Sequence, residues 1–195
     1  MAHTSSSSAP PALDARERAV LLDVAYEAIR EGRRLGGPPA QSLETYPPAL
    51  RAHAATFVTL HLAGELRGCI GTLEACQPLA VDTAKNAYAA AYRDPRFPAL
   101  TPPEIADVDV HISILTPPEP LVFATEEELL AQLRPGLDGL ILSERGRRST
   151  FLPAVWETVG EPREFLARLK LKAGLPADYW SDTIRVSRYA TLDVA

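Results

Sequence analysis

Two glycines separated by only a cysteine and an isoleucine make the segment Leu66–Gly71 the feature that most constrains how this chain can fold. Glycine weakens a strand by about 0.5–1 kcal/mol, because it adds backbone entropy and packs no side chain. A strand that holds both Gly68 and Gly71 therefore indicates close backbone approach at a bulge, a neighbouring element or a ligand. The preceding segment Thr56–Leu62 is β-branched and apolar, which predicts a hairpin with its turn at Ala63–Glu65.

Side-chain alternation along the second arm of this hairpin predicts one face with Arg67, Cys69 and Gly71 and another with Leu66, Gly68 and Ile70. A cation would then lie beside a thiol, and a neighbouring cation favours the reactive thiolate. Cys69 is therefore a candidate catalytic nucleophile. The alternative is an unreactive, buried cysteine beside two packing glycines, which is the commoner role of a free cysteine.

Length, net charge and the distribution of apolar residues indicate a globular domain and argue against broad nucleic-acid binding and a membrane span. A chain of 195 residues can bury a full core, and we expect one domain over residues 14–195 after a disordered tail of residues 1–13. The net charge of −5 argues against broad nucleic-acid binding. No apolar run approaches the roughly 18–20 residues that span a bilayer, and the first residues lack the pattern of a signal peptide.

The cysteine content predicts free thiols and no structural metal site. Cys69 and Cys76 are seven residues apart, with no Cys-x-x-Cys pair or histidine-rich cluster nearby. A disulfide framework and a zinc site both need more ligands than this. We therefore expect no metal, no cofactor and a reducing cytoplasmic location.

The periodicity of the chain predicts an α+β fold with a mostly antiparallel sheet and flanking helices. Helices are expected at Asp14–Gly32, with Gly32 as the stop, and at Pro78–Tyr92, Thr101–Glu104, Thr125–Arg134, Ala154–Val159 and Pro162–Ala173. Strands are expected at Thr56–Leu62, Leu66–Thr72, Val108–Leu115, Asp138–Ser143, Arg148–Leu152 and Thr183–Tyr189. Because the inner residues of the first hairpin are mostly apolar, we expect the hairpin to be interior to its sheet.

Several blocks of the chain, taken in order, resemble a known family. The matching segments are Leu66–Gly71, Asn86–Ala87, Asp94–Pro98, Val110–Leu115, Asp138–Gly139, Thr150–Pro153, Val155–Trp156, Phe165–Leu166 and Lys172–Leu175. Together they resemble the AMMECR domain family, whose bacterial members are called AmmeMemoRadiSam system protein A. His61 is outside the family pattern, and Ala154 stands where the family often has glutamine.

The resemblance implies a two-lobed α+β domain, with a larger lobe, a smaller lobe and a cleft between them. The family has no settled activity. Its system name implies a Memo-like protein and a radical S-adenosylmethionine protein as partners, in a pathway that modifies a small molecule or a macromolecule.

Two functions remain open at this point. The chain is an enzyme or enzyme accessory that uses Cys69, or it is a non-catalytic module that binds a small anionic ligand or a protein through planar guanidinium groups. RNA binding, a third possibility, lacks the interleaved strand aromatics that it needs. The candidate ligand-binding residues are Arg67, Gly68, Gly71, Asp94 and Arg96.

Overall fold

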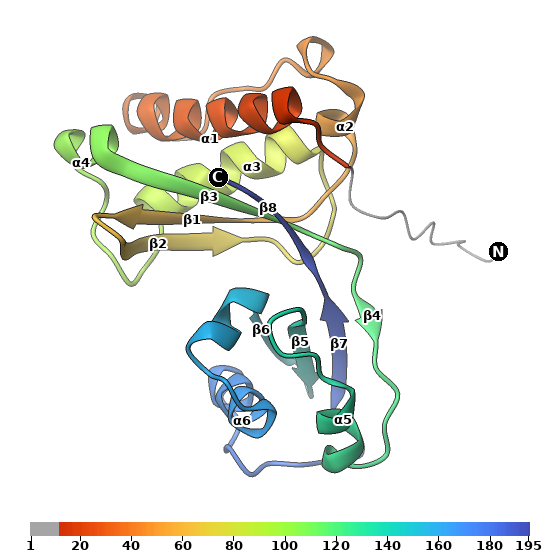
Figure 1. Ribbon diagram of the computed structural model, residues 1–195. Coiled ribbons are helices and arrows are strands. Elements are labelled where there is room, and N and C mark those ends of the chain that lie inside the picture. Colours follow the sequence, from red (N-terminus) through yellow and green to blue (C-terminus); the bar gives the residue numbers. More distant parts are fainter. Residues whose placement is uncertain (1–11) are drawn as a thin grey trace. The chain divides into compact units, whose positions relative to one another are not determined.

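The computed structural model describes residues 12–195, so most of the expected tail lies outside the described residues. The chain divides into two compact units, one ending at Leu115 and completed by Leu192–Ala195, and one formed by Thr116–Thr191 (Figure 1). Leu13, assigned to the tail by sequence, is buried in the core of the first unit. Both units combine helices with a four-stranded sheet, which confirms the α+β class.

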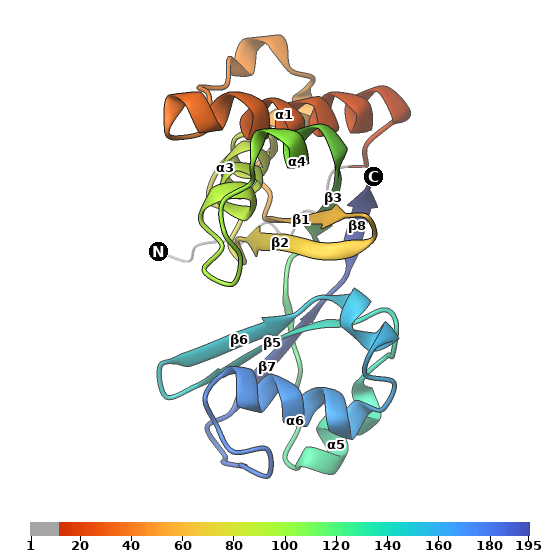
Figure 2. The same ribbon diagram turned by 90° about the vertical axis from the view of Figure 1, so that its left-hand side faces the viewer.

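The first unit carries its main helices on one face of its sheet. Its sheet has the strand order β2-β1-β3-β8, and β1 pairs antiparallel with both β2 and β3. The two longest helices, α1 and α3, lie together over the same face of this sheet in both views (Figure 1 and Figure 2). The elements are α1 (Ala15–Leu35), the 3₁₀ turn η1 (Leu43–Thr45), α2 (Pro48–Arg51), β1 (Thr56–Leu62), β2 (Glu65–Gly71), α3 (Leu79–Tyr92), α4 (Pro102–Asp107), β3 (Val108–Leu115) and β8 (Thr191–Val194).

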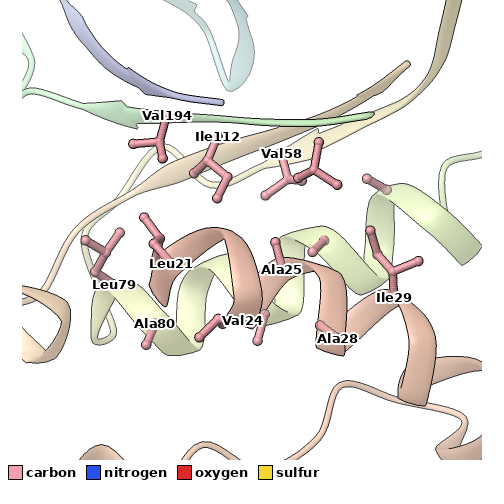
Figure 3. Close-up of a cluster of buried hydrophobic side chains, with 14 of the residues drawn as sticks. Leu21, Val24, Ala25, Ala28, Ile29, Val58, Leu79, Ala80, Ile112 and Val194 are labelled. Carbon is pink, nitrogen blue, oxygen red and sulfur yellow. The ribbon is translucent and has the colours of Figure 1, made fainter. Parts of the chain in front are cut away.

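The core of this unit is formed by apolar residues that recur with the helical period in α1 and at alternate positions in the strands. Helix α1 places apolar residues such as Leu21 and Ala25 on one stripe, and the strands contribute alternate residues such as Val58 and Ile112 (Figure 3). On α3 the inward residues are mostly alanines, which allow the helix axis to lie close to the sheet. The predicted bounds of β1, β3 and α3 are confirmed to within one residue.

The predicted end of the first helix is wrong. The helix begins, as expected, with a capping box between Asp14 and Glu17, but it continues through Gly32 and ends at Gly36, whose φ is +71°. Gly32 has a packing role instead. A Cβ at that position would lie 2.6 Å from a ring carbon of Tyr88, so α3 could not approach α1 there.

The first hairpin is not interior to its sheet, contrary to the prediction. β1 is central, but β2 is the edge strand. The turn has two residues, Ala63 and Gly64, with φ values of +50° and +83°, which suits the right-handed twist of the two arms.

The second unit has its own sheet, helices and core. The sheet order is β4-β7-β5-β6, and β5 pairs antiparallel with β6 and β7. Phe165 packs in this core with its ring stacked 3.9 Å from that of Trp156. The elements are β4 (Glu119–Pro120), α5 (Glu126–Gln132), β5 (Gly139–Glu144), β6 (Arg147–Phe151), the 3₁₀ turn η2 (Pro153–Glu157), α6 (Pro162–Lys172) and β7 (Arg185–Tyr189).

The helix predicted at Ala154–Val159 is the 3₁₀ turn η2, in which the N–H groups of Val155 and Thr158 donate to carbonyl oxygens three residues earlier. The short elements α2, β4 and β8 were not predicted. Within residues 12–195, no helix has the length and apolar character needed to cross a membrane.

Candidate functional site

A β-bulge interrupts the candidate segment. Leu60 of β1 lies opposite Gly68, but the next residue, His61, lies opposite Leu66, so Arg67 is the extra residue of β2. The side chains of β2 therefore do not alternate regularly between the two faces of the sheet at this point. Leu66 shares the face of His61 and not that of Gly68, contrary to the prediction.

Cys69 is held on the outer edge of β2 by side chains from the loop after α3. Its N–H donates to Oδ2 of Asp94 at 2.9 Å, and its carbonyl oxygen accepts from Nη2 of Arg96 at 3.0 Å. Both backbone polar groups of Cys69 thus point away from β1. Asp94 and Arg96 occupy the edge where another strand would otherwise pair.

The two clamping residues form a strong ion pair with each other. Arg96 donates to Asp94 through Nε at 2.9 Å and through Nη2 at 2.7 Å. Asp94 is buried, and its bonds to Arg96 and to the Cys69 N–H hold the pKa of its carboxyl well below the usual range. The hydrogen bonds that Arg96 donates to Asp94 also raise the pKa of Arg96. The carboxylate is therefore charged at any physiological pH.

Arg67 contacts a different partner. Its Nε and Nη2 donate to the carboxylate of Glu104 at 2.9 and 3.3 Å, and its Nη1 donates to the carbonyl oxygen of Pro98. Glu104 also accepts from Thr101 in the capping box of α4. The bonds to Arg67 and Thr101 lower the pKa of Glu104 to about 2. The guanidinium that contacts Cys69 belongs to Arg96, and Arg67 ties β2 to α4.

The two glycines of the segment allow close approach of protein atoms. A Cβ on Gly68 would lie 2.3 Å from the backbone carbonyl oxygen of Ala90 on α3. A Cβ on Gly71 would lie 2.3 Å from the ring of Phe57. Of the three causes expected from sequence, a neighbouring element accounts for both glycines.

The Cys69 side chain lies on the face of the sheet opposite α3. The residue is half-buried, and its Sγ accepts from the Thr59 hydroxyl at 3.4 Å. Cys69 and Thr59 are directly opposite on β2 and β1. Because the backbone groups of Cys69 point outward, this is a non-hydrogen-bonded pair, in which side chains come closest.

The same row continues to a pair of histidines. Thr59 lies opposite His111 on β3, and the ring of His111 is 5.2 Å from that of His61, edge to face. Cys69, Thr59 and His111 thus form a row across three strands on the face of the sheet opposite α3. In residues 12–195 neither ring is hydrogen-bonded to the sulfur. Over the same range no group of three His, Cys, Asp or Glu side chains could hold a metal ion.

Sequence reasoning missed a buried carboxylate at the end of the candidate strand. Asp82 of α3 is completely buried and accepts from the N–H and hydroxyl of Thr56, from the hydroxyl of Thr72 and from the amides of Gln77 and Asn86. These bonds join the start of β1, the residue after β2 and the first turns of α3. The sequence signal was a polar pair, Asp82 and Asn86, spaced one helical turn apart among the alanines of the helix.

Comparisons with known proteins agree on one family. The AMMECR1 family model matches residues 22–194. A protein of Methanothermobacter thermautotrophicus is 39% identical over 175 residues, covering 89% of this chain and 91% of its own length. A protein of Thermotoga maritima is 42% identical over 149 residues, covering 75% of this chain and 80% of its own.

A solved structure extends the agreement to three dimensions. The crystal structure of an uncharacterized protein of Pyrococcus horikoshii superposes with a TM-score of 0.86 at 32% sequence identity. The match covers 93% of this chain and 92% of that chain. The two proteins therefore share their fold across nearly the whole length.

Proposed function

The chain belongs to the AMMECR1 family, and on this premise we propose that it is an enzyme or enzyme accessory of a modification pathway, with Cys69 as its reactive group. The site is centred on Leu66–Gly71. A cytoplasmic location, where Cys69 and Cys76 stay reduced, belongs to the same proposal.

One observation carries this proposal. Both backbone polar groups of Cys69 are bonded to the Asp94–Arg96 pair, while the residue stays half-buried on the face of the sheet opposite α3. A rigidly held side chain loses little entropy when it reacts, which is a general property of catalytic groups. The Thr59 hydroxyl already donates to the sulfur, and a thiolate accepts such a bond more strongly than a thiol does.

Alkylation of the native protein tests the proposal. We expect iodoacetamide at neutral pH to modify half-buried Cys69 at least as fast as exposed Cys76, with mass spectrometry of the peptides separating the two. Thr59→Val keeps the shape of the side chain and removes the hydroxyl, so it should slow the reaction of Cys69 and leave Cys76 unchanged. A Cys69 that stays unmodified while Cys76 reacts would mean that the thiol is only packed.

Stability measurements separate a reactive cysteine from a packing one. Cys69→Ser should leave the melting temperature within a few degrees of the parent and abolish function. Ile70→Asp places a charge against the core of the first unit and should unfold the protein. An equal loss of stability in both variants would favour packing as the role of Cys69.

A second candidate function is a non-catalytic module that binds a small anionic ligand. The favouring observation is that Arg96, although bonded to Asp94, keeps 54% of its side chain exposed. Gly68, Gly71 and Asp94 would then position β2, which carries Arg67, beside the loop after α3, which carries Arg96. Ligand-dependent melting with phosphate or carboxylates should be present in the parent and lost in Arg96→Ala, and Arg96→Lys, which keeps the charge, should retain part of it.

The pathway partners are tested directly. We propose that the chain acts with a Memo-like protein and a radical S-adenosylmethionine protein, as the family resemblance implies. Titration of the purified chain with each protein from the same genome should give saturable binding. If neither protein binds and neither changes the reactivity of Cys69, a direct interaction is ruled out.

A further inference from the structure

A second charged site lies in the unit formed by residues 116–191. The β5–β6 hairpin and the start of β7 line a surface depression of about 440 Å³. Four arginines belong to its lining, namely Arg145, Arg147, Arg148 and Arg185, against one carboxylate, Glu144. The depression thus has a formal charge of +3 in a chain whose net charge is −5.

Sheet register places two of these arginines on either side of a hydroxyl. Ser143 of β5 lies opposite Arg148 on β6 and opposite Arg185 on β7, so the three residues form one row on one face. Neighbouring strands are about 4.8 Å apart, which separates the two arginine backbones by about 10 Å. Two guanidinium groups on long side chains can therefore contact different parts of one ligand.

The one carboxylate of the lining, Glu144, is engaged by hydroxyl groups of the loop before β7. Glu144 is buried and accepts from the hydroxyls of Tyr179, Ser181 and Thr183, and it forms an ion pair with Arg145. The hydroxyl bonds lower the pKa of Glu144. They also hold the loop before β7 against the tip of the hairpin, which organises the rim of the depression.

Arg185 provides the clearest signal of an external ligand. Arg185 is exposed, and its side chain has no hydrogen bond or ion pair with any other residue of the described range 12–195. By contrast, Arg147 donates to the carbonyl oxygen of Gly174, Arg145 contacts Glu144, and Arg148 also interacts with another part of the protein. Guanidinium groups recognise phosphate oxygens in a planar, bidentate manner.

We propose that this depression binds an oligophosphate group. A diphosphate carries about three negative charges at neutral pH, which matches the formal charge of +3 of the lining residues more closely than the single charge of a monocarboxylate does. The volume is within the range of about 300–1,000 Å³ typical of small-molecule sites. The site is independent of Cys69 and of the function proposed for it.

Calorimetric titration of the full chain with inorganic pyrophosphate tests the proposal, at constant ionic strength. We expect saturable binding that Arg185→Gln weakens about tenfold or more, the effect of losing one charge-assisted contact. Arg145→Gln, a second exposed position, should also weaken it. ADP as a second titrant distinguishes the source of the group, since tighter binding of ADP than of pyrophosphate identifies a nucleotide.

The matched control is Arg163→Gln. Arg163 is an exposed arginine of the same unit, on α6, and is only 3.8 Å from Glu127 in a weak ion pair. Its removal changes the net charge equally and should leave pyrophosphate binding within about twofold. Equal weakening by Arg163→Gln and Arg185→Gln, no binding at millimolar pyrophosphate, or binding of a single-stranded RNA oligonucleotide in its place would each overturn the proposal.

Discussion

At the scale of single residues, the conformation of the candidate segment depends on two positions without a side chain, Gly68 and Gly71. Gly68 faces the backbone of α3, and Gly71 faces the ring of Phe57, so neither position tolerates a Cβ without movement of its neighbours. Cys69, between them, has its backbone bonded to Asp94 and Arg96. The two glycines therefore position the strand on which Cys69 lies.

The first prediction concerns Gly68→Ala. The added methyl would lie 2.3 Å from a backbone oxygen of Ala90, which cannot rotate away, so we expect a loss of about 1–3 kcal/mol in the free energy of unfolding. Urea unfolding monitored by circular dichroism measures it. Gly37→Ala is the control, because no atom lies within 4 Å of the position that its new methyl would occupy, and it should be neutral or slightly stabilising. A neutral Gly68→Ala would contradict the close packing of β2 on α3.

At the scale of elements, β2 is an edge strand whose outer side is covered by side chains. Asp94 and Arg96 bond to its backbone at Cys69, and Arg67 connects it to Glu104 of α4. Charged and covered edges discourage pairing with other chains. The Arg67–Glu104 ion pair joins β2 to α4, which no sheet ladder connects. The strength of this connection depends on the charge of Glu104.

The second prediction is a loss of stability in acid. The pKa of Glu104 is lowered from 4.5 to about 2, so its ion pair with Arg67 stabilises the fold fully above the unfolded value near 4.5. That contribution is lost as the pH falls from about 4.5 towards about 2. Asp94, whose pKa is also lowered, adds to the loss in acid.

Glu104→Gln should reduce stability by about 1–3 kcal/mol at neutral pH and flatten its decline in acid, as measured by urea unfolding at several pH values. The control is Glu65→Gln, which removes an exposed acid from the same strand β2. It should change neither property. An unaltered pH profile in Glu104→Gln would show that other groups cause the acid loss.

At the scale of the whole molecule, the chain builds two separate hydrophobic cores. One is formed by α1, α3 and the sheet β2-β1-β3-β8, and the other by α5, α6 and the sheet β4-β7-β5-β6. The second unit, Thr116–Thr191, is a continuous segment placed between β3 and the final strand of the first. Each core can therefore be perturbed by itself.

The third prediction uses one substitution in each core. Phe165→Ala removes a fully buried ring stacked on Trp156, a change that costs about 3–5 kcal/mol. Hydrogen exchange should accelerate mainly in residues 116–191. Leu21→Ala, in the core of the first unit, should give the reciprocal pattern. Uniform acceleration across both units in either variant would mean that the chain unfolds as one cooperative block.

Local signals were sufficient for much of this protein. The capping boxes at Asp14 and Thr101 and the alternation of Val108–Leu115 could be recognised from sequence, because each depends on residues near one another in the chain. The α+β class followed from the order of the predicted elements, and the family resemblance followed from motif blocks such as Leu66–Gly71 and Asp94–Pro98.

What the sequence determined by itself was the class of fold, most element positions and the candidate cysteine. Tertiary structure alone decided that β2 is an edge strand, that a bulge at Arg67 breaks the alternation, and that Arg96 is the cation bonded to Cys69. It also assembled the donors around Asp82. The bonds from Asp94 and Arg96 to Cys69 and from Thr56 to Asp82 join residues 25 or more positions apart, whose partners no local period or propensity specifies.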